Sequence, residues 1–394
     1  MITFVAIGII LLFIGNWIVK NIPFLWKNAI PGPVIGGFIF SIIALILYLL
    51  NIAQFEYDNS LYDLAMYVFF VTIGLTTGLS TLRKGGKILL IYMMVCWVLV
   101  FLQNGTSLGI SYLMGMDPLL GLMAGQASLQ GGHGMAGSLA PLIESLGQSS
   151  ALTVGMTAAT FGLIAGSVLG GPVGNYLITK NKVKIQTDDA TDLESLEEDQ
   201  ETKRTVDVHS FLVSIGLIIV TLAIGLPTAE LITEITGFSV PGHIFSLFIG
   251  IVIRSICDHK KIIEISQDSM DIISSISLNL FLVMAMMKLS LWELANLAIP
   301  LTVLLIIQVV ITIALAIFIM YRVIGRDYDA AVMTSGFIGH GLGATPNGLV
   351  VMNAVTDKYG VFSKKAFIII PVAGTVLTDV VGVPVFVFLA NLIG

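Results

Sequence analysis

Two short glycine-rich stretches hold the residues that could bind a small ligand. The first reads LQGGHGMAG, from Leu129 to Gly137, and the second reads IGHGLGATPNG, from Ile338 to Gly348. Each interrupts apolar sequence with glycines, polar side chains and the shared core GHG. Glycine lets a ligand approach the main chain closely, and the amides at the start of a helix attract anions. The two stretches therefore predict a cradle of main-chain amides for a small anionic substrate.

The side chains beside these amides are neutral. No Lys or Arg lies in the middle of any apolar segment, so an anion would be held by amides, hydroxyls and bound cations. His133 has no second His or Cys at metal-ligand spacing. Its ring either ties the stretch to a neighbouring helix, which we favour, or contacts the ligand directly. The residues expected to bind the substrate are Ser128, Gln130, Gly131, Gly132, His133, Gly134, Gly341, Gly343, Ala344, Thr345 and Asn347.

Asp379, in the stretch GTVLTDVVG, is the carboxylate that lies deepest within an apolar segment. A carboxylate inside a membrane costs about 2.5–3.5 kcal/mol or more, which marks it as a functional residue. We expect it to ligate Na⁺ together with nearby carbonyl oxygens. A structural cap of a broken helix and a proton carrier are the alternatives. The expected Na⁺ ligands are Asp379, Thr375, Thr160 and Asn279.

The composition decides which class of protein must position these residues. Hydrophobic residues make up 56% of the 394 residues and charged residues only 11%, far too little charge to cover a soluble surface. Apolar runs of near 20 residues recur, each long enough to cross a hydrocarbon core of roughly 30 Å. The sequence therefore predicts an all-α polytopic membrane protein surrounded by lipid. No acid–base or metal cluster indicates an enzyme, and the charge pattern indicates no nucleic-acid partner.

The predicted spans fall into two halves of five. Residues 1–178 form the first half and residues 210–394 the second, and 179–209 is an acidic stretch that we interpret as a cytoplasmic linker. Each half contains a glycine-rich region, 117–147 or 328–361, that is expected to form a re-entrant helical hairpin. The first span is expected to be retained rather than cleaved as a signal peptide. The predicted spans are 2–19, 30–51, 62–80, 87–115, 152–178, 210–228, 238–256, 270–288, 297–321 and 366–391.

The two halves resemble each other in sequence. IPGPVIGGF at Ile30 pairs with VPGHIFSLF at Val240, and His133 pairs with His340 at nearly the same offset along the chain. Since each half has an odd number of spans, the second half must enter the membrane upside down relative to the first. The sequence thus predicts two inverted-topology repeats, an arrangement common in secondary transporters.

Lys and Arg predict the orientation of these spans. With both termini outside the cytoplasm and both hairpins re-entrant, eighteen of the nineteen Lys and Arg residues face the cytoplasm, and Lys288 alone faces out. If either hairpin crossed the membrane completely, this bias would collapse. The charge pattern therefore itself favours re-entrant hairpins.

Five motifs resemble landmarks of one family, the bacterial sodium/glutamate symporters. They are GGHG in the first hairpin, GHGLGATP in the second, ATFGL and GGPV in the fifth span, and GRDYDAAV before the second hairpin. The resemblance implies Na⁺-coupled uptake of L-glutamate across the bacterial plasma (inner) membrane. It also implies a homodimer in which a hairpin-bearing domain moves against a fixed scaffold, as in an elevator.

Two kinds of alternative remain open at this stage. A related carrier could take aspartate or a di- or tricarboxylate, or couple to H⁺ instead of Na⁺. A channel is the alternative from another class, and it would carry current far above carrier rates.

Overall fold

The computed structural model describes residues 2–27, 30–53, 55, 57, 59–77, 86–183, 207–237, 240–260, 263, 265–294, 297–374 and 378–394. Every regular element within these ranges is a helix, as the sequence predicts. The elements are α1 (Ile2–Asn21), α2 (Pro23–Lys27), α3 (Gly32–Leu49), α4 (Ser60–Thr76), α6 (Gly86–Met114), α7 (Pro118–Met123), α8 (Gln126–Leu129), α9 (Gly132–Ser145), α10 (Ala151–Lys180), α12 (Val208–Thr236), α13 (Gly242–Lys260), α14 (Gln267–Met287), η2 (Leu291–Leu294), α15 (Ala298–Leu315), η3 (Ala316–Met320), α16 (Tyr321–Ile324), α17 (Tyr328–Tyr359), α18 (Lys364–Val372) and α19 (Asp379–Ile393).

Eight helices in the described part of the chain are long and apolar enough to cross a membrane. They are α1, α3, α6, α10, α12, α13, α14 and the run from α15 to α16. The other two predicted spans correspond to shorter apolar helices, α4 and α19. Most of the predicted linker, residues 184–206, lies outside the described residues.

The predicted last span contains two helices. The sequence predicts one continuous helix over 366–391, and the structure has α18 up to Val372 and α19 from Asp379. Residues 375–377 between them lie outside the described residues. The continuity of the last span therefore stays a prediction.

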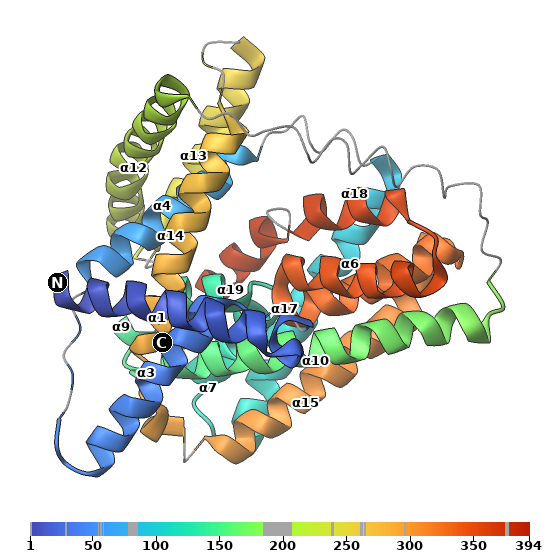
Figure 1. Ribbon diagram of the computed structural model, residues 1–394, viewed down its shortest axis with the longest axis horizontal. Helices are drawn as coiled ribbons and strands as arrows, with labels where there is room; N and C mark the ends of the chain where they lie inside the picture. Colours follow the sequence, from blue (N-terminus) through green and yellow to red (C-terminus); the bar gives the residue numbers. More distant parts are fainter. Residues whose placement is uncertain are drawn as a thin grey trace.

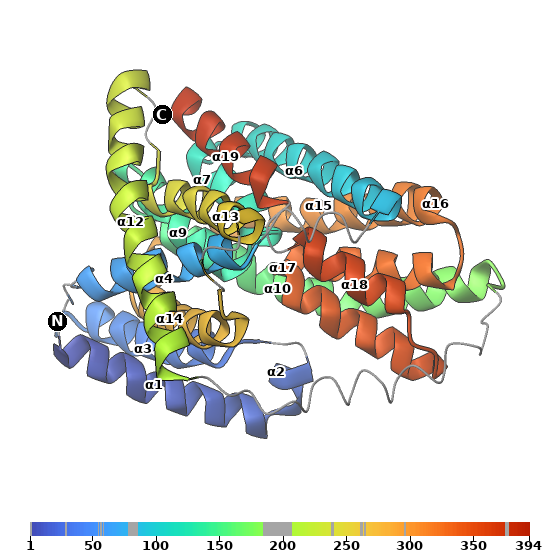
Figure 2. The ribbon, with the colours of Figure 1, turned by 90° about the horizontal axis from the view of Figure 1, so that it is seen from above.

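The helices pack in two groups, which Figure 1 and Figure 2 show side by side. Helix group 1 comprises α1, α3, α4, α12, α13 and α14, and helix group 2 comprises α6 to α10 and α15 to α19. The closest packing lies within the groups, between α4 and both α13 and α14, and between α10 and α17. Between the groups, α9 meets α14 and α10 meets η2. The two parts of the chain, before and after residues 184–206, are distributed over the groups in the same way. In each part the first helices belong to helix group 1 and the later helices belong to helix group 2.

The chain of α17 turns back on itself, forming what we call hairpin 2. Gly343 and Ala344 leave the helical conformation, with φ of −143° and 65°. The Asn347 side-chain amide donates to the carbonyl of Gly339 at 3.2 Å. Eight residues of continuous helix would separate these positions by about 12 Å. The two arms of α17 therefore run side by side and meet at Gly343–Ala344.

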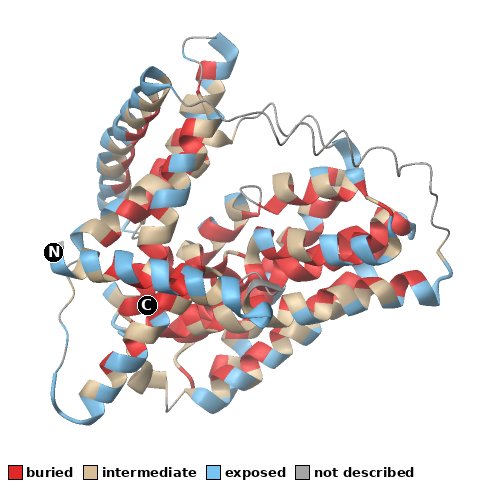
Figure 3. Ribbon diagram, viewed as in Figure 1, coloured by how far each residue is buried: buried red, intermediate tan, exposed pale blue. Residues whose placement is uncertain are grey.

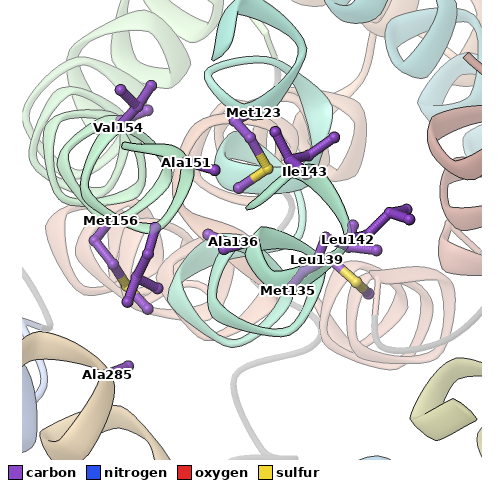
Figure 4. Packing of buried hydrophobic residues seen from close by; sticks show 14 of the residues in the cluster. Met123, Met135, Ala136, Leu139, Leu142, Ile143, Ala151, Val154, Met156 and Ala285 are labelled. Carbon is purple, nitrogen blue, oxygen red and sulfur yellow. The ribbon is translucent and has the colours of Figure 1, made fainter. Parts of the chain in front are cut away.

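A second break-and-return lies in α7, α8 and α9, which together we call hairpin 1. The short α8 is flanked by Gly125 and Gly131, and Gly132 begins α9 with a φ of +64°. The arms α7 and α9 contact each other and pack on α10. Figure 4 shows this packing, with Met123, Met135 and Met156 filling the space between the helices.

Burial separates the inside of the bundle from its outer faces. Figure 3 shows buried residues concentrated on the two hairpins and α10 and exposed residues on the outward sides of the other helices. Many of the exposed side chains are large and apolar, such as Phe13 and Trp17, each 68% exposed, and Leu113, 82% exposed. Such a surface suits hydrocarbon rather than water.

Candidate functional site

The tips of the two hairpins meet inside helix group 2. A Cβ atom placed on Gly132 would lie 2.8 Å from the Cβ of Ala344. Both residues have positive φ, +64° at Gly132 and +65° at Ala344. Glycine adopts this conformation at little cost, but alanine does so only when its surroundings hold it there. The two glycine-rich stretches that the sequence singled out are thus in direct contact.

A chain of side-chain amides connects the two tips. Gln130 in hairpin 1 donates to the side-chain oxygen of Gln103 at 2.9 Å. Gln103, on α6, donates in turn to the carbonyl of Gly341 in hairpin 2 at 2.9 Å. All of these groups are buried. Buried hydrogen bonds of this kind fix the position of one tip relative to the other through α6.

His133 is attached to the neighbouring helix α10. Its Nε2 lies 2.9 Å from the hydroxyl oxygen of Thr160. Thr160 donates its own proton to the carbonyl of Met156, so its oxygen accepts from the His133 N–H. This hydrogen bond matches the interpretation of His133 as a neutral tie between the hairpin and a neighbouring helix. This hydrogen bond also uses the hydroxyl oxygen of Thr160, which is one of the expected Na⁺ ligands.

Three further expected substrate ligands lie at the same two tips. The Ser128 hydroxyl donates to the carbonyl of Met123 within hairpin 1. Asn347 is fully buried, and its amide bonds to Ser167 and to the carbonyls of Leu163 and Gly339. A Cβ placed on Gly374 would lie against the hydroxyl oxygen of Thr345. Thr345 therefore faces Gly374, which follows α18 in the chain.

The expected Na⁺ ligands do not gather in one place. Asp379 begins α19 and is half-buried. Asn279 lies on α14 in helix group 1, where its amide donates to the carbonyl of Ser275 at 2.8 Å. Thr375 lies outside the described residues. Among the described residues, no three His, Cys, Asp or Glu side chains form a cluster that could hold a metal ion.

Two further buried amides at the same site were not among the expected ligands. Neither the nitrogen nor the oxygen of the Asn104 or Gln126 side chain has a hydrogen-bond partner among the described residues. Asn104 is 1% exposed and Gln126 is 0% exposed. The signal in the sequence was the presence of polar amides inside apolar segments, but sequence does not reveal whether such groups find partners.

The junction between the two helix groups is formed at one end of hairpin 1. Tyr62 on α4 donates to the carbonyl of Gly137 on α9 at 2.7 Å, and the Lys288 ammonium lies 4.4 Å from the centre of the Tyr62 ring. Burial lowers the pKa of Lys288, and the negative charges of Glu144 and Asp63 oppose this shift. The junction thus combines these polar contacts with apolar packing, because one buried apolar cluster includes residues of both groups.

Two helix groups, apolar outer faces and two broken hairpins whose tips meet define a multi-pass membrane protein of the secondary-transporter class. A family model described as "Sodium/glutamate symporter" matches residues 1–361. The chain belongs to the sodium/glutamate symporter family, which confirms the resemblance found in its motifs. It is a transporter and not an enzyme.

Named relatives agree with the family model. The sodium/glutamate symporter of Haemophilus influenzae is 37% identical over 379 residues, which cover 95% of this chain and 93% of the relative. The sodium/glutamate symporter of Escherichia coli is 36% identical over 371 residues, 94% of this chain and 92% of that protein. The solved structure of the sodium proton antiporter MjNhaP1 from Methanocaldococcus jannaschii aligns with a TM-score of 0.44 at 13% identity, over 100% of this chain and 98% of that one.

Proposed function

We propose that this protein carries L-glutamate together with Na⁺ into the cell. Membership in the sodium/glutamate symporter family supports both the substrate and the coupling ion. The observation that carries the proposal within the structure is the contact between Gly132 and Ala344. It brings main-chain amides of both glycine-rich stretches to one point, as a site for an anionic amino acid requires.

The substrate site would use the main chain of both tips. The amides of Gly131 to Gly134 and Gly341 to Ala344 would take the α-carboxylate, with Thr345 facing the same region. Ser128, Gln130 and Asn347 would position the tips and the rest of the substrate. His133 would fix hairpin 1 to α10 rather than contact glutamate.

Alternating access would arise from movement of one helix group against the other. Both hairpins lie in helix group 2. Among the helix pairs that pack closely, those that join the two groups are α9 with α14 and α10 with η2. Group 2 would then carry the substrate as an elevator domain, and group 1 would be the scaffold. Glutamate and Na⁺ would bias the equilibrium by binding the outward and inward states with different affinity.

The topology proposed from the sequence fits this mechanism. The two halves would be inverted repeats with re-entrant hairpins at 117–147 and 328–361, joined by the cytoplasmic linker 179–209. Both termini would lie outside the cytoplasm, because this orientation leaves all Lys and Arg except Lys288 on the cytoplasmic side. Two copies would assemble as a homodimer in the bacterial inner membrane.

Uptake into proteoliposomes tests the proposed function. Purified protein is reconstituted, and entry of radiolabelled L-glutamate is measured with an inward Na⁺ gradient, with choline replacing Na⁺, and with an inward H⁺ gradient alone. We expect uptake only with Na⁺, inhibited by unlabelled glutamate more strongly than by aspartate or a tricarboxylate. Uptake that follows the H⁺ gradient alone, or that is specific for another acid, would contradict the proposal.

A further inference from the structure

The hydrogen bonds of Gln103 determine which atom of Gln130 is left without a partner. The carbonyl of Gly341 can only accept, so the amide nitrogen of Gln103 must point to it, at 2.9 Å. The oxygen of Gln103 therefore faces Gln130 and accepts from its nitrogen, at 2.9 Å. The side-chain oxygen of Gln130 remains, buried and without a hydrogen-bond partner among the described residues.

Gln308 on α15 repeats this arrangement. Its nitrogen donates to the main-chain carbonyl of Gln103 at 2.8 Å and to the hydroxyl of Ser107 at 2.8 Å. The carbonyl again fixes the orientation, because it cannot donate. The side-chain oxygen of Gln308 is therefore a second buried acceptor without a partner.

Asn104 and Gln126 add two more such oxygens at the same place. A Cβ on Gly125, the residue before Gln126, would lie 3.2 Å from the side-chain oxygen of Asn104 and 2.7 Å from the hydroxyl of Ser107. Gln126 and Gln130 are one helical turn apart on α8, so they share one face of it. Asn104 lies on α6, and Gln126, Gln130 and Gln308 thus lie near the same part of α6, between Gln103 and Ser107.

The first turn of α19 closes this region. A Cβ on Gly382 would lie 2.5 Å from the side-chain nitrogen of Gln126 and 3.2 Å from its oxygen. Gly382 lies one turn beyond Asp379, which begins α19. The helices α6, α8 and α19 contact one another in pairs. The turn of α19 that bears Asp379 therefore lies beside the amide of Gln126.

We propose that the side-chain oxygens of Asn104, Gln126, Gln130 and Gln308, with the carboxylate of Asp379, form the binding site of the co-transported Na⁺. The proposal rests on the proposed Na⁺ coupling, and it names the residues that would bind the ion. Unpartnered buried oxygens cost free energy unless a cation or donor satisfies them, and hard cations take oxygen ligands of this kind. The expected ligands Thr160 and Asn279 are not part of this set.

The chemistry favours a cation over the amino acid at this place. Four side chains offer a free oxygen, and only Asn104 and Gln126 also offer a free nitrogen. The sequence places no Lys or Arg on α7, α8, α15 or α19, and on α6 only Lys87 in the first turn. A carboxylate of glutamate would meet mostly oxygens here, whereas Na⁺ would meet its preferred ligands and one counter-charge.

The substitution Gln126→Met distinguishes a Na⁺ site from a substrate site at this place. Methionine keeps the length of the side chain but removes the free oxygen and nitrogen, so the Na⁺-free protein should be as stable as before or more stable. Thermal unfolding in detergent is measured in NaCl and in choline chloride, and glutamate uptake into proteoliposomes is measured over a range of Na⁺ concentrations. Asn104→Leu is the second variant, and Thr334→Val is the control, since the buried Thr334 hydroxyl bonds only to Ala330 in its own helix.

We expect NaCl to raise the unfolding temperature of the unsubstituted protein and of Thr334→Val, and the gain to be lost in Gln126→Met and Asn104→Leu. The Na⁺ concentration for half-maximal uptake should rise at least about tenfold in both, equivalent to about 1.4 kcal/mol. An unchanged Na⁺ dependence in both variants would overturn the site, and the free oxygens would then bind water. A raised KM for glutamate at saturating Na⁺ with unchanged Na⁺ dependence would overturn it in favour of the substrate. Na⁺-independent uptake by the unsubstituted protein would instead overturn the proposed function itself.

Discussion

Gly132 and Ala344 lie against each other, although more than two hundred residues separate them in the chain. Each adopts a positive φ, and a methyl group on Gly132 would come within 2.8 Å of the Cβ of Ala344. The contact joins the tip of hairpin 1 to the tip of hairpin 2 at the place where both helices break. The shape of the proposed substrate cradle therefore depends on the absence of a side chain at Gly132.

Gly132→Ala tests this contact. The substitution places a side chain at a positive φ and against Ala344, so we expect it to lower the free energy of unfolding by about 1–2 kcal/mol. Glutamate uptake per folded protein should fall about tenfold, which needs a loss of only about 1.4 kcal/mol in binding. Gly147→Ala is the matched control, because Gly147 also has a positive φ, +100°, but no described atom lies within 4 Å of a Cβ placed there. Equal effects of the two substitutions would show that the tip contact does not matter.

Asp379→Asn tests the role of the negative charge at the start of α19. Asparagine has nearly the size of aspartate but carries no negative charge. The Na⁺ concentration for half-maximal uptake should therefore rise at least about tenfold. The KM for glutamate at saturating Na⁺ should change much less, because the substrate binds at the hairpin tips. If Na⁺ dependence is unchanged and only thermal stability falls, Asp379 caps the broken helix and does not bind the ion.

Asn347 and Thr345 are expected to differ in role. The Asn347 amide bonds to Ser167, Leu163 and Gly339, so Asn347→Leu leaves buried carbonyls unsatisfied and should cost about 1–3 kcal/mol of stability, with or without Na⁺. Thr345→Val keeps the shape at the tip and should instead raise the KM for glutamate. Thermal unfolding and uptake of both variants measure this difference. A raised KM in Asn347→Leu with unchanged stability would make Asn347 a substrate ligand.

A cross-link between the helix groups tests their relative movement. The main-chain N–H of Ser290, between α14 and η2, donates to the hydroxyl of Thr153 on α10 at 3.1 Å. A Thr153→Cys/Ser290→Cys pair should form a disulfide on oxidation and stop uptake, with recovery on reduction. Each single substitution, oxidised in parallel, should retain uptake. Full uptake by the cross-linked protein would contradict movement of group 2 across this contact.

Much of the site was predictable because its signals are local. Glycines, a histidine and small polar residues inside apolar sequence marked both hairpin tips, and Asp379 stood out as a carboxylate in an apolar segment. The continuity of the last span stays a prediction, because residues 375–377 lie outside the described ones. Asn104 and Gln126 were left out of the expected ligands because a buried amide looks the same in sequence whether or not it has a partner.

The sequence by itself determined the class of protein and the places where its helices break. In a membrane the main chain must satisfy its own hydrogen bonds, so long apolar runs become helices and glycine-rich interruptions become sites. Only the tertiary structure decided which polar atoms meet. Gln103 joins the two tips, Asn347 is tied to α10, and four buried amide oxygens have no hydrogen-bond partner among the described residues. These outcomes depend on contacts between residues far apart in the chain, and no local pattern encodes them.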